Sequence, residues 1–267
     1  MPRRTFVIAE AASTHDGSLD LALELVGIAA DAGADACKFQ FWSNADRLAD
    51  RRKVGPEYRE IYRRYQVPQK WLPILRSECV RLGLEFMCTT FLPEDIQIVA
   101  PFVERFKIAS FEAGDQQFLE AHNRFAKPVI LSTGMMDWGE AFRAANTLHH
   151  CEAVLHCVSA YPCREPNLAA IRQLGEICKP GFSDHTGDVR TGGLAVMAGA
   201  EVIEVHFSSL NTDPNNPDNA PAVHGGCFEG GLADYISHIR YAEECIGSGE
   251  KAALQEEAEM AEYRVAT

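Results

Sequence analysis

Short apolar segments alternate with amphipathic helical segments along the whole sequence. The apolar segments that have the length of strands span residues 5–10, 36–41, 84–90, 105–110, 128–133, 153–159, 180–184 and 202–208. Between them, stretches such as "LDLALELVGIAADAG" repeat their apolar residues with the period of a helix. Glycine follows several of these stretches just before the next strand, as in "AGADA" and "RLGLE". The pattern therefore predicts eight strand–helix repeats.

Eight repeats within 267 residues are typical of an α/β fold closed into a (β/α)8 TIM barrel, and we predict a single domain spanning residues 1–267. An open, doubly wound sheet is the alternative, but no GxGxxG follows the first strand. The seventh strand has the weakest pattern, because "GFSD" is short and begins with glycine. Segment 42–68 is too long for a strand–helix connection, so we expect a lid or capping excursion there. Residues 248–267 are expected to form one charged terminal helix.

Charge and cysteine usage narrow the classes of partner. A net charge of −13 predicts no general affinity for nucleic acid or for an anionic membrane. An anionic substrate must then be bound by a few local cations and backbone dipoles. The nine cysteines form no CxxC pair, and the sequence contains neither a signal peptide nor an apolar run of 18 residues. We therefore expect a protein of the reducing cytoplasm, without a membrane partner.

In a TIM barrel the chemistry lies where the strands end. Every predicted strand of this chain ends in residues that can bind or react: Glu10, Lys38, Gln40, Thr89, Lys107, Ser110, Glu112, Ser132, Thr133, His156, Ser159, Tyr161, Ser183, Asp184, His185 and His206. Lys38 and Lys107 are cations on apolar strands, where a lysine is costly unless it meets an anion. Hydroxyl groups beside them can donate hydrogen bonds to a phosphate or a carboxylate; they belong to Thr89, Ser110, Ser132 and Ser183.

Two histidines and one glutamate add further chemistry. His185 and His206 end adjacent strands, close enough in a barrel to bind one divalent metal ion. Glu10 can act as a base or an acid if its pKa is shifted. Each residue type also has a structural interpretation: a histidine can be a hydrogen-bonded core residue, a serine can cap a loop, and a strand lysine can pair with Glu10 or Glu112 inside the barrel. Asp184 either orients the His185 ring or caps the following helix.

Six motifs, in this order, resemble those of the sialic acid (N-acetylneuraminate) synthase family: "IAEAASTHDGSLDLALELVGIAADAGADACKFQ", "FKIASFEAGD", "KPVILSTGM", "LHCVSAYP", "GFSDHT" and "EVIEVHF". Members of this family join phosphoenolpyruvate to an N-acylated amino sugar and release phosphate, which gives nine-carbon 2-keto acids, the nonulosonic acids. The resemblance implies a metal-dependent transferase of carbohydrate biosynthesis. Its substrates would be phosphoenolpyruvate and an N-acylmannosamine-like aldehyde sugar.

The resemblance also implies a role for each candidate residue. Glu10, Lys38 and Lys107 would be catalytic, with Glu10 orienting or deprotonating the attacking water. His185 and His206 would hold a divalent ion, Mn²⁺ first, with Mg²⁺ or Co²⁺ as alternatives. The residues implied in substrate binding are Gln40, Thr89, Ser110, Glu112, Ser132, Tyr161, Ser183 and Asp218. The sugar would be contacted by Gln40, Glu112, Tyr161 and Asp218, and phosphoenolpyruvate by the two lysines and the hydroxyl residues.

Some features depart from the family pattern. Thr14 stands where the family has asparagine, Phe111 stands where a glycine leaves room, and Asp218 is matched only with an offset of one residue. The chain also stops where family members usually continue into a small antifreeze-like domain, so we expect it to contain the barrel domain only. We also expect it to form a homodimer. The acceptor sugar stays open. The alternatives are a metal-dependent barrel aldolase or hydrolase acting on another anion, and a non-catalytic anion-binding homologue.

Overall fold

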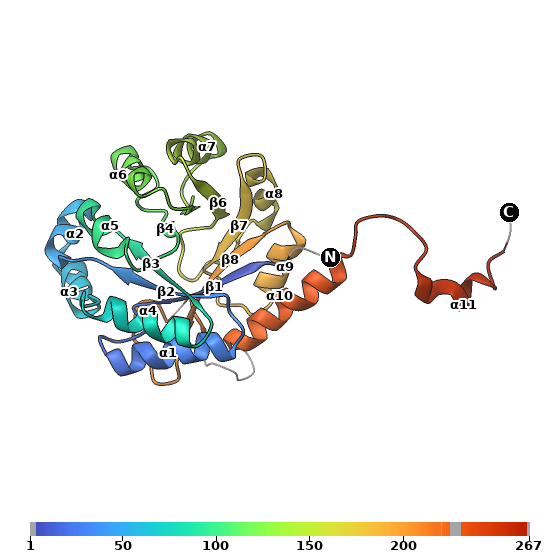
Figure 1. Ribbon diagram of the computed structural model, residues 1–267, viewed down its shortest axis with the longest axis horizontal. Coiled ribbons are helices and arrows are strands. Elements are labelled where there is room, and N and C mark those ends of the chain that lie inside the picture. Colours follow the sequence, from blue (N-terminus) through green and yellow to red (C-terminus); the bar gives the residue numbers. More distant parts are fainter. Residues whose placement is uncertain (1–3, 220, 225–230, 266–267) are drawn as a thin grey trace.

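The computed structural model describes residues 4–219, 221–224 and 231–265. Its main strands are β1 (Phe6–Ala12), β2 (Ala36–Phe41), β3 (Glu85–Thr90), β4 (Phe106–Ile108), β5 (Val129–Ser132), β6 (Cys151–His156), β7 (Lys179–Asp184) and β8 (Val202–Ser208). Each strand pairs in parallel with the next, and β1 also pairs with β8, which closes the barrel (Figure 1). The predicted TIM barrel is thus confirmed, and the open doubly wound sheet is excluded. A short strand that was not predicted, β9 (Val223–His224), pairs with β8.

Helices surround the barrel. The outer layer consists of α1 (Leu19–Asp31), α4 (Trp71–Arg81), α5 (Pro93–Val99), α6 (Gln116–His122), α7 (Trp138–Thr147), α8 (Ile171–Leu174), α9 (Thr191–Met197) and α10 (Leu232–Ile246), with 3₁₀ turns η1 (Asn123–Phe125) and η2 (Leu168–Ala170). Ser18 begins α1, because its side chain accepts a hydrogen bond from the Leu21 N–H. No helix among the described residues is both long and apolar enough to cross a membrane.

Alternation along the strands decides which side chains face the inside of the barrel. Ile8, Ala36, Met87, Ile130, Ala153, Leu155 and Val202 form one buried cluster there. The residues two positions further along these strands face the same interior, and several of them are polar: Glu10, Lys38, Thr89, Ser132 and Glu204. An apolar floor therefore supports a polar layer at the carboxyl end of the barrel.

The seventh strand is regular despite its weak sequence pattern. Gly181 belongs to the floor of the barrel. A Cβ atom at this position would lie 2.2 Å from Leu155 Cδ2 and 2.6 Å from the carbonyl oxygen of Val202. The glycine that weakens the sequence pattern is therefore required by the close packing of β7 against its neighbours.

Segment 42–68 contains two helices, α2 (Ala45–Arg52) and α3 (Pro56–Arg64). They are anchored on the loop that follows β3 by a small core of their own, formed by Trp42, Ala45, Leu48, Tyr65, Phe91 and Leu92. The Ser43 N–H also donates to the buried carboxylate of Asp95 at 3.0 Å. We call this segment the α2–α3 excursion; its function as a lid stays a prediction.

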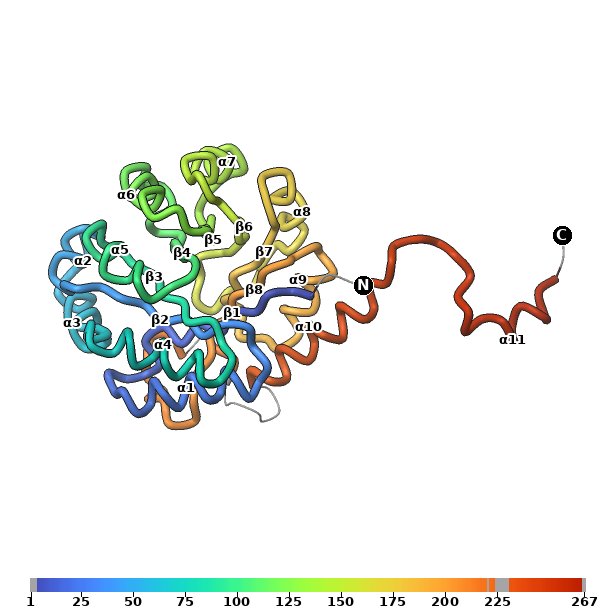
Figure 2. Tube along the Cα trace, viewed as in Figure 1, coloured from blue at the N-terminus to red at the C-terminus, as the bar shows by residue number. Residues whose placement is uncertain are grey.

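The prediction of one helix over residues 248–267 is wrong for the described part of that segment. Only η3 (Gln255–Glu257) and α11 (Ala258–Ala261) are helical there. Gly247, with a positive φ angle of 62°, follows the last residue of α10 and ends it, and Gly249 also has a positive φ angle, of 75°. Residues 248–265 are all exposed and run away from the barrel (Figure 2). Without an apolar surface to pack against, a short helix is only marginally stable in water.

Candidate functional site

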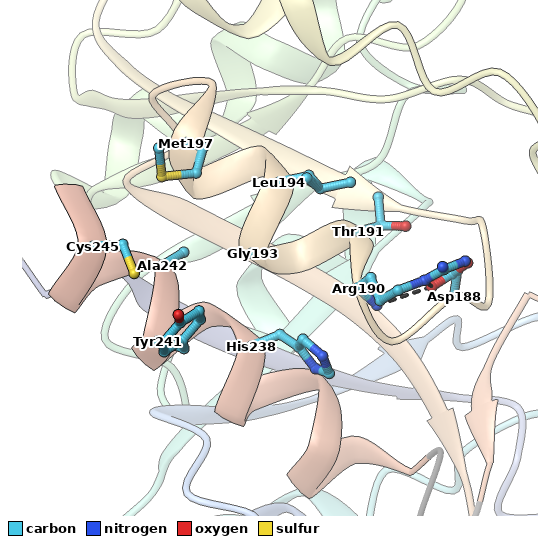
Figure 3. A pocket seen from close by; sticks show the side chains of 10 residues that line it. All are labelled: Asp188, Arg190, Thr191, Gly193, Leu194, Met197, His238, Tyr241, Ala242 and Cys245. Carbon is cyan, nitrogen blue, oxygen red and sulfur yellow. Dashed lines mark hydrogen bonds and ion pairs between the residues drawn. The ribbon is translucent and has the colours of Figure 1, made fainter.

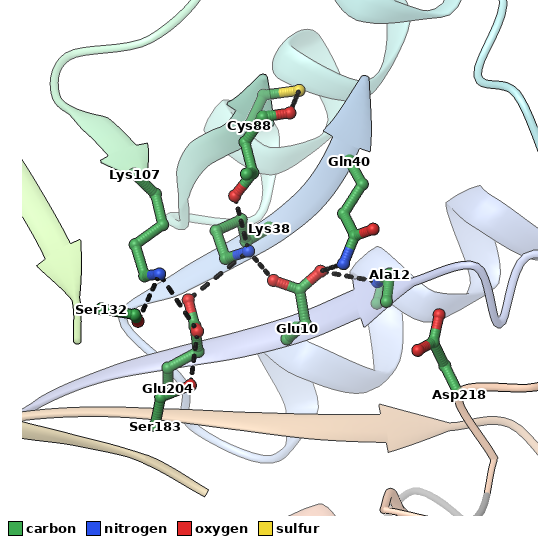
Figure 4. A network of polar contacts seen from close by, with 12 residues as sticks. Glu10, Ala12, Lys38, Gln40, Cys88, Lys107, Ser132, Ser183, Glu204 and Asp218 are labelled. Atoms are coloured by element: carbon green, nitrogen blue, oxygen red, sulfur yellow. Dashed lines mark hydrogen bonds and ion pairs between the residues drawn. The ribbon is translucent and has the colours of Figure 1, made fainter. Parts of the chain in front are cut away.

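Two lysines and two glutamates form a buried network at the carboxyl end of the barrel (Figure 4). Lys38 forms an ion pair with Glu10, and its Nζ lies 3.4 Å from Glu204 Oε2. Lys107 Nζ lies 3.5 Å from Glu204 Oε1. The pairing of a strand lysine with Glu10 inside the barrel is therefore present. Because the two cations and two anions balance, all four charges can be buried together.

Three of the four predicted hydroxyl groups are bound to this network. Lys38 Nζ donates to Thr89 Oγ1 at 2.9 Å, and Lys107 Nζ donates to Ser132 Oγ at 2.7 Å. Ser183 Oγ donates to Glu204 Oε1 at 2.8 Å. The fourth, Ser110, lies beside the network: its Oγ accepts a hydrogen bond from the Gly134 N–H and lies 3.0 Å from Cys157 Sγ.

Burial and neighbouring charges set the ionisation of the network. Burial lowers the pKa of Lys38 to about 8, although the negative charge of Glu204 opposes the shift. Burial alone would raise the pKa of Glu204, but Lys107 and Lys38 outweigh it and hold that pKa below its usual value. A further anion entering the network would raise the pKa of Lys38 again.

Glu204 is the site residue that the sequence prediction missed. It is 5% exposed and contacts both lysines and Ser183. A signal was present in "EVIEVHF", because Glu204 precedes His206 by two residues and side chains at that spacing share one face of a strand.

His185 and His206 lie side by side near the network, with ring centroids 5.5 Å apart and ring planes tilted by 58°. Burial lowers the pKa of His185 to about 4 and also lowers that of His206, so both rings are neutral at pH 7, the form that binds metals. His185 Nδ1 is hydrogen-bonded to the Val158 carbonyl oxygen at 2.8 Å, which directs Nε2 away from the backbone. Nδ1 of His206 is buried without a hydrogen-bond partner in the described part of the chain.

The histidine pair fits part of a divalent metal site. In the described part of the chain, no group of three or more His, Cys, Asp or Glu side chains is arranged to hold a metal ion. Two imidazole ligands would therefore have to be completed by water or by substrate oxygen atoms. The metal ion itself stays a prediction.

Asp184 has a different role from either predicted one. Its Oδ1 accepts hydrogen bonds from the N–H and hydroxyl of Thr186, both at 2.7 Å, and its Oδ2 accepts one from the Tyr235 hydroxyl at 2.8 Å. It is not bonded to the His185 ring, and α9 begins seven residues later, at Thr191. Asp184 thus ties the loop after β7 to α10.

The predicted sugar-binding residues surround the mouth of the barrel. The Tyr161 ring lies 4.3 Å from the His185 ring and is 45% exposed. Gln40 Nε2 lies 3.5 Å from Glu10 Oε1. Asp218 accepts a hydrogen bond from the Ser13 N–H at 3.0 Å. Glu112 is farther round the rim, where it forms an ion pair with an arginine of the α2–α3 excursion.

Other polar residues at the strand ends have structural contacts. The Thr133 hydroxyl donates to the Leu155 carbonyl oxygen at 3.0 Å, and His156 Nε2 lies 2.9 Å from the Pro166 carbonyl oxygen. Thr14 donates to the carbonyl oxygens of Ala11 and Phe207, at 2.7 and 3.1 Å. These side chains hold loops in place. Ser159 differs, because its hydroxyl is buried and finds no hydrogen-bond partner within residues 4–219, 221–224 and 231–265.

A separate groove of about 620 Å³ lies on the outside of the barrel between α9 and α10 (Figure 3). It is lined by Asp188, Arg190, Thr191, Gly193, Leu194, Met197, His238, Tyr241, Ala242 and Cys245. None of the predicted site residues lines this groove. We therefore assign the chemistry to the barrel mouth.

Comparison with known proteins relates the chain to acid synthases. The NeuB family matches residues 25–251. The N,N'-diacetyllegionaminic acid synthase of Legionella pneumophila is 34% identical over 92% of this chain and 74% of that protein. A pseudaminic acid synthase of Campylobacter jejuni is 31% identical over 96% of this chain and 78% of that protein. The crystal structure of N-acetylneuraminic acid (sialic acid) synthetase from Leptospira borgpetersenii, in complex with citrate, matches with a TM-score of 0.86 at 30% identity, covering 98% of this chain and 91% of that chain.

Proposed function

The chain belongs to the NeuB family, and we propose that it condenses phosphoenolpyruvate with an N-acylmannosamine-like aldehyde sugar to form a nonulosonic acid and phosphate. The observation that carries the proposal is the pair of buried lysines, Lys38 and Lys107, each bonded to a hydroxyl group beside two neutral histidines. The relatives make different acids, so family membership leaves the acceptor sugar undecided.

The charges of the site suit phosphoenolpyruvate. This substrate carries a phosphate and a carboxylate, and Lys38 and Lys107 provide one cation for each end. Hydroxyl groups of Thr89, Ser132 and Ser183 lie where they can redirect their hydrogen bonds to the substrate. Ser110 would complete this half of the site.

The reaction would form a carbon–carbon bond to the aldehyde carbon and a C2–O bond to water, and it would break the C2–O bond to phosphate. The aldehyde oxygen takes up a proton and becomes a hydroxyl group. C3 of phosphoenolpyruvate attacks the aldehyde carbon, and positive charge develops at C2. Water adds at C2, and cleavage of the C2–O bond then releases phosphate and leaves the 2-keto group. Glu10, paired with Lys38, would orient this water and accept its proton, while the lysines stabilise the negative charge of the substrate.

His185 and His206 would hold a divalent ion, Mn²⁺ first, with Mg²⁺ or Co²⁺ as alternatives. When bound, the ion would polarise the aldehyde oxygen as a Lewis acid. The neutral, buried state of both rings and the unpartnered His206 Nδ1 support this assignment.

Phosphate release tests the proposal. Protein incubated with phosphoenolpyruvate, Mn²⁺ and N-acetylmannosamine, or with a panel of N-acylated hexosamines, should release phosphate and form a 2-keto acid. EDTA should stop the reaction, and added Mn²⁺ should restore it. If protein shown to bind Mn²⁺ released no phosphate with any aldehyde, the proposal would be wrong.

One observation favours a second candidate, a Schiff-base aldolase. A buried lysine with its pKa lowered to about 8, as for Lys38, has the character of an imine-forming lysine. Borohydride treatment in the presence of pyruvate would trap such an imine as a covalent adduct on Lys38. An unmodified Lys38 would argue against this alternative.

We also propose a cytoplasmic location, which is supported by the absence of disulfides among the eight described cysteines. The expected homodimer stays a prediction. Sedimentation velocity would measure it directly.

A further inference from the structure

A half-buried arginine of the α2–α3 excursion reaches a carboxylate at the rim of the barrel. Arg52 donates to Glu112 Oε1 from Nη2 at 2.9 Å and from Nε at 3.3 Å. Its Nη1 donates to the Tyr62 hydroxyl at 3.2 Å. The guanidinium carbon lies 4.7 Å from the centre of the Phe91 ring and 5.0 Å from that of Phe111. The ion pair and the surrounding rings together fix the position of Arg52.

Glu112 uses one oxygen for this pair and leaves the other without a partner. The residue is 2% exposed, and its Oε2 is buried with no hydrogen-bond partner among the described residues. A buried carboxylate oxygen that lacks a donor is costly, and a bound ligand with an O–H or N–H group can supply one. Glu112 lies four residues beyond β4, whose Lys107 belongs to the charged network.

We propose that Arg52 is a positioning residue of the acceptor subsite. It holds Glu112 so that the free oxygen accepts a hydrogen bond from a hydroxyl or amide group of the acceptor sugar. Phe111, which is 57% exposed, offers an apolar ring face beside this carboxylate. The inference rests on the proposed function, and it assigns part of acceptor recognition to the α2–α3 excursion.

The charge of Arg52 also bears on the ionisation of Glu112. Burial raises the pKa of Glu112, and the positive charges of Arg52, Arg51 and Lys107 oppose that shift, with Arg52 contributing most. Without Arg52 the carboxyl group would become protonated at a higher pH. A protonated Glu112 would lose the ionised acceptor oxygen that the sugar needs.

Substitution of Arg52 has a matched control on the same helix. Arg51 also bonds a carboxylate, Asp115 at 2.6 Å, and its guanidinium lies 5.3 Å from the Phe118 ring, but it has no hydrogen bond to Glu112. We expect Arg52→Met to raise the KM for N-acetylmannosamine about tenfold, the worth of one charge-assisted hydrogen bond, and to leave the KM for phosphoenolpyruvate within about twofold. Arg51→Met, which removes only a charge that is not hydrogen-bonded to Glu112, should change the KM for N-acetylmannosamine far less.

The pH profile and a conservative variant distinguish positioning from general support of the fold. In Arg52→Met, the acid limb of kcat/KM for the sugar should move to higher pH. Arg52→Lys should restore part of the sugar affinity, because it keeps a positive charge near Glu112. Equal increases of both KM values, or equal effects of Arg51→Met and Arg52→Met, would overturn the proposal.

Binding measurements separate this inference from the proposed function. Calorimetry with phosphoenolpyruvate and saturation-transfer NMR with N-acetylmannosamine need no turnover. If both ligands bind without phosphate release, the proposed function is wrong. A sugar signal that is lost in Arg52→Met but kept in the wild type and in Arg51→Met would still support the role of Arg52. If phosphoenolpyruvate binds but no N-acylated sugar of the panel does, the acceptor subsite is overturned and the phosphoenolpyruvate half of the site stands.

Discussion

At the level of single residues, the site depends on charges that neutralise one another inside the barrel. Glu204 bridges Lys38 and Lys107, and Glu10 pairs with Lys38, so the free protein buries no net charge in this layer. A ligand that brings several negative charges disturbs this balance. Lys38 can respond near neutral pH, because burial lowers its pKa to about 8.

Phosphoenolpyruvate binding should therefore take up protons near pH 8. At that pH roughly half of the free protein has a neutral Lys38, since its pKa is about 8. A bound anion favours the ammonium form and raises this pKa, so binding at pH 8 should take up about half a proton, and much less near pH 6.5. Calorimetric titrations in buffers with different ionisation enthalpies measure the uptake.

The matched variant is Lys38→Arg, which stays positively charged at both pH values. It should bind phosphoenolpyruvate with little or no proton uptake at pH 8. Equal uptake by the wild type and this variant would show that another group titrates.

The residues that sequence analysis found and missed differ in one physical respect. Lys38 and Lys107 stand out in the sequence because a lysine on an apolar strand is costly to bury unless it meets an anion. Glu204 has the same property, yet its role emerges only when both lysines are seen to converge on it. Arg52 lies in a charged segment, where nothing local distinguishes it from Arg51; only the fold brings it to Glu112.

At the level of elements, the local sequence pattern was sufficient to predict the bounds of an element that buries a fixed face. The strands predicted over 36–41 and 202–208 have the same bounds in the structure, because their side chains are almost all buried. The terminal segment has helix-forming residues, but its described part, 248–265, has no surface to pack against, so the local pattern predicted too long a helix. Sequence alone could not supply that missing tertiary contact.

Gly181 provides a test of how closely β7 packs. In Gly181→Ala the added Cβ would lie 2.6 Å from the Val202 carbonyl oxygen, which belongs to the adjacent strand and cannot move freely. Overpacking of this kind costs about 1–3 kcal/mol, so we expect the free energy of unfolding to fall by at least that amount. Urea unfolding followed by circular dichroism measures the change.

Gly27 is the control for this substitution. It lies inside α1, and a Cβ atom there would meet nothing within 4 Å. Alanine at this position should stabilise the protein by roughly 0.5–1 kcal/mol, because it lowers the entropy of the unfolded chain and favours the helix. A Gly181→Ala variant as stable as the wild type would contradict the packing of β7 described above.

At the level of the whole molecule, the layer between strands and helices buries ionisable groups away from the site as well. His122 packs between the rings of Phe106 and Phe118, at 5.0 and 4.9 Å, and His15 packs against Trp71 at 5.7 Å. Burial lowers the pKa of each histidine to about 4. Both are therefore neutral in the folded protein at pH values where the unfolded chain protonates them.

This difference makes the stability of the barrel depend on pH. Between about pH 6.5 and pH 4 the unfolded state binds one more proton at each of these histidines, so the free energy of unfolding falls as the pH is lowered through that window. Each histidine should contribute a slope of about 1.4 kcal/mol per pH unit. Urea titrations between about pH 5 and pH 6, in EDTA to remove metal ions, measure the slope.

Replacing His122 should remove the contribution of this histidine to the pH dependence of the free energy of unfolding. His122→Leu is expected to lower the slope by about 1.4 kcal/mol per pH unit, whatever its effect on stability at pH 7, because leucine binds no proton in either state. His149 is exposed, and His149→Leu serves as the control for the loss of a histidine outside the core. An unchanged slope in His122→Leu would mean that His122 titrates alike in the folded and unfolded states, which contradicts its burial between the two phenylalanine rings.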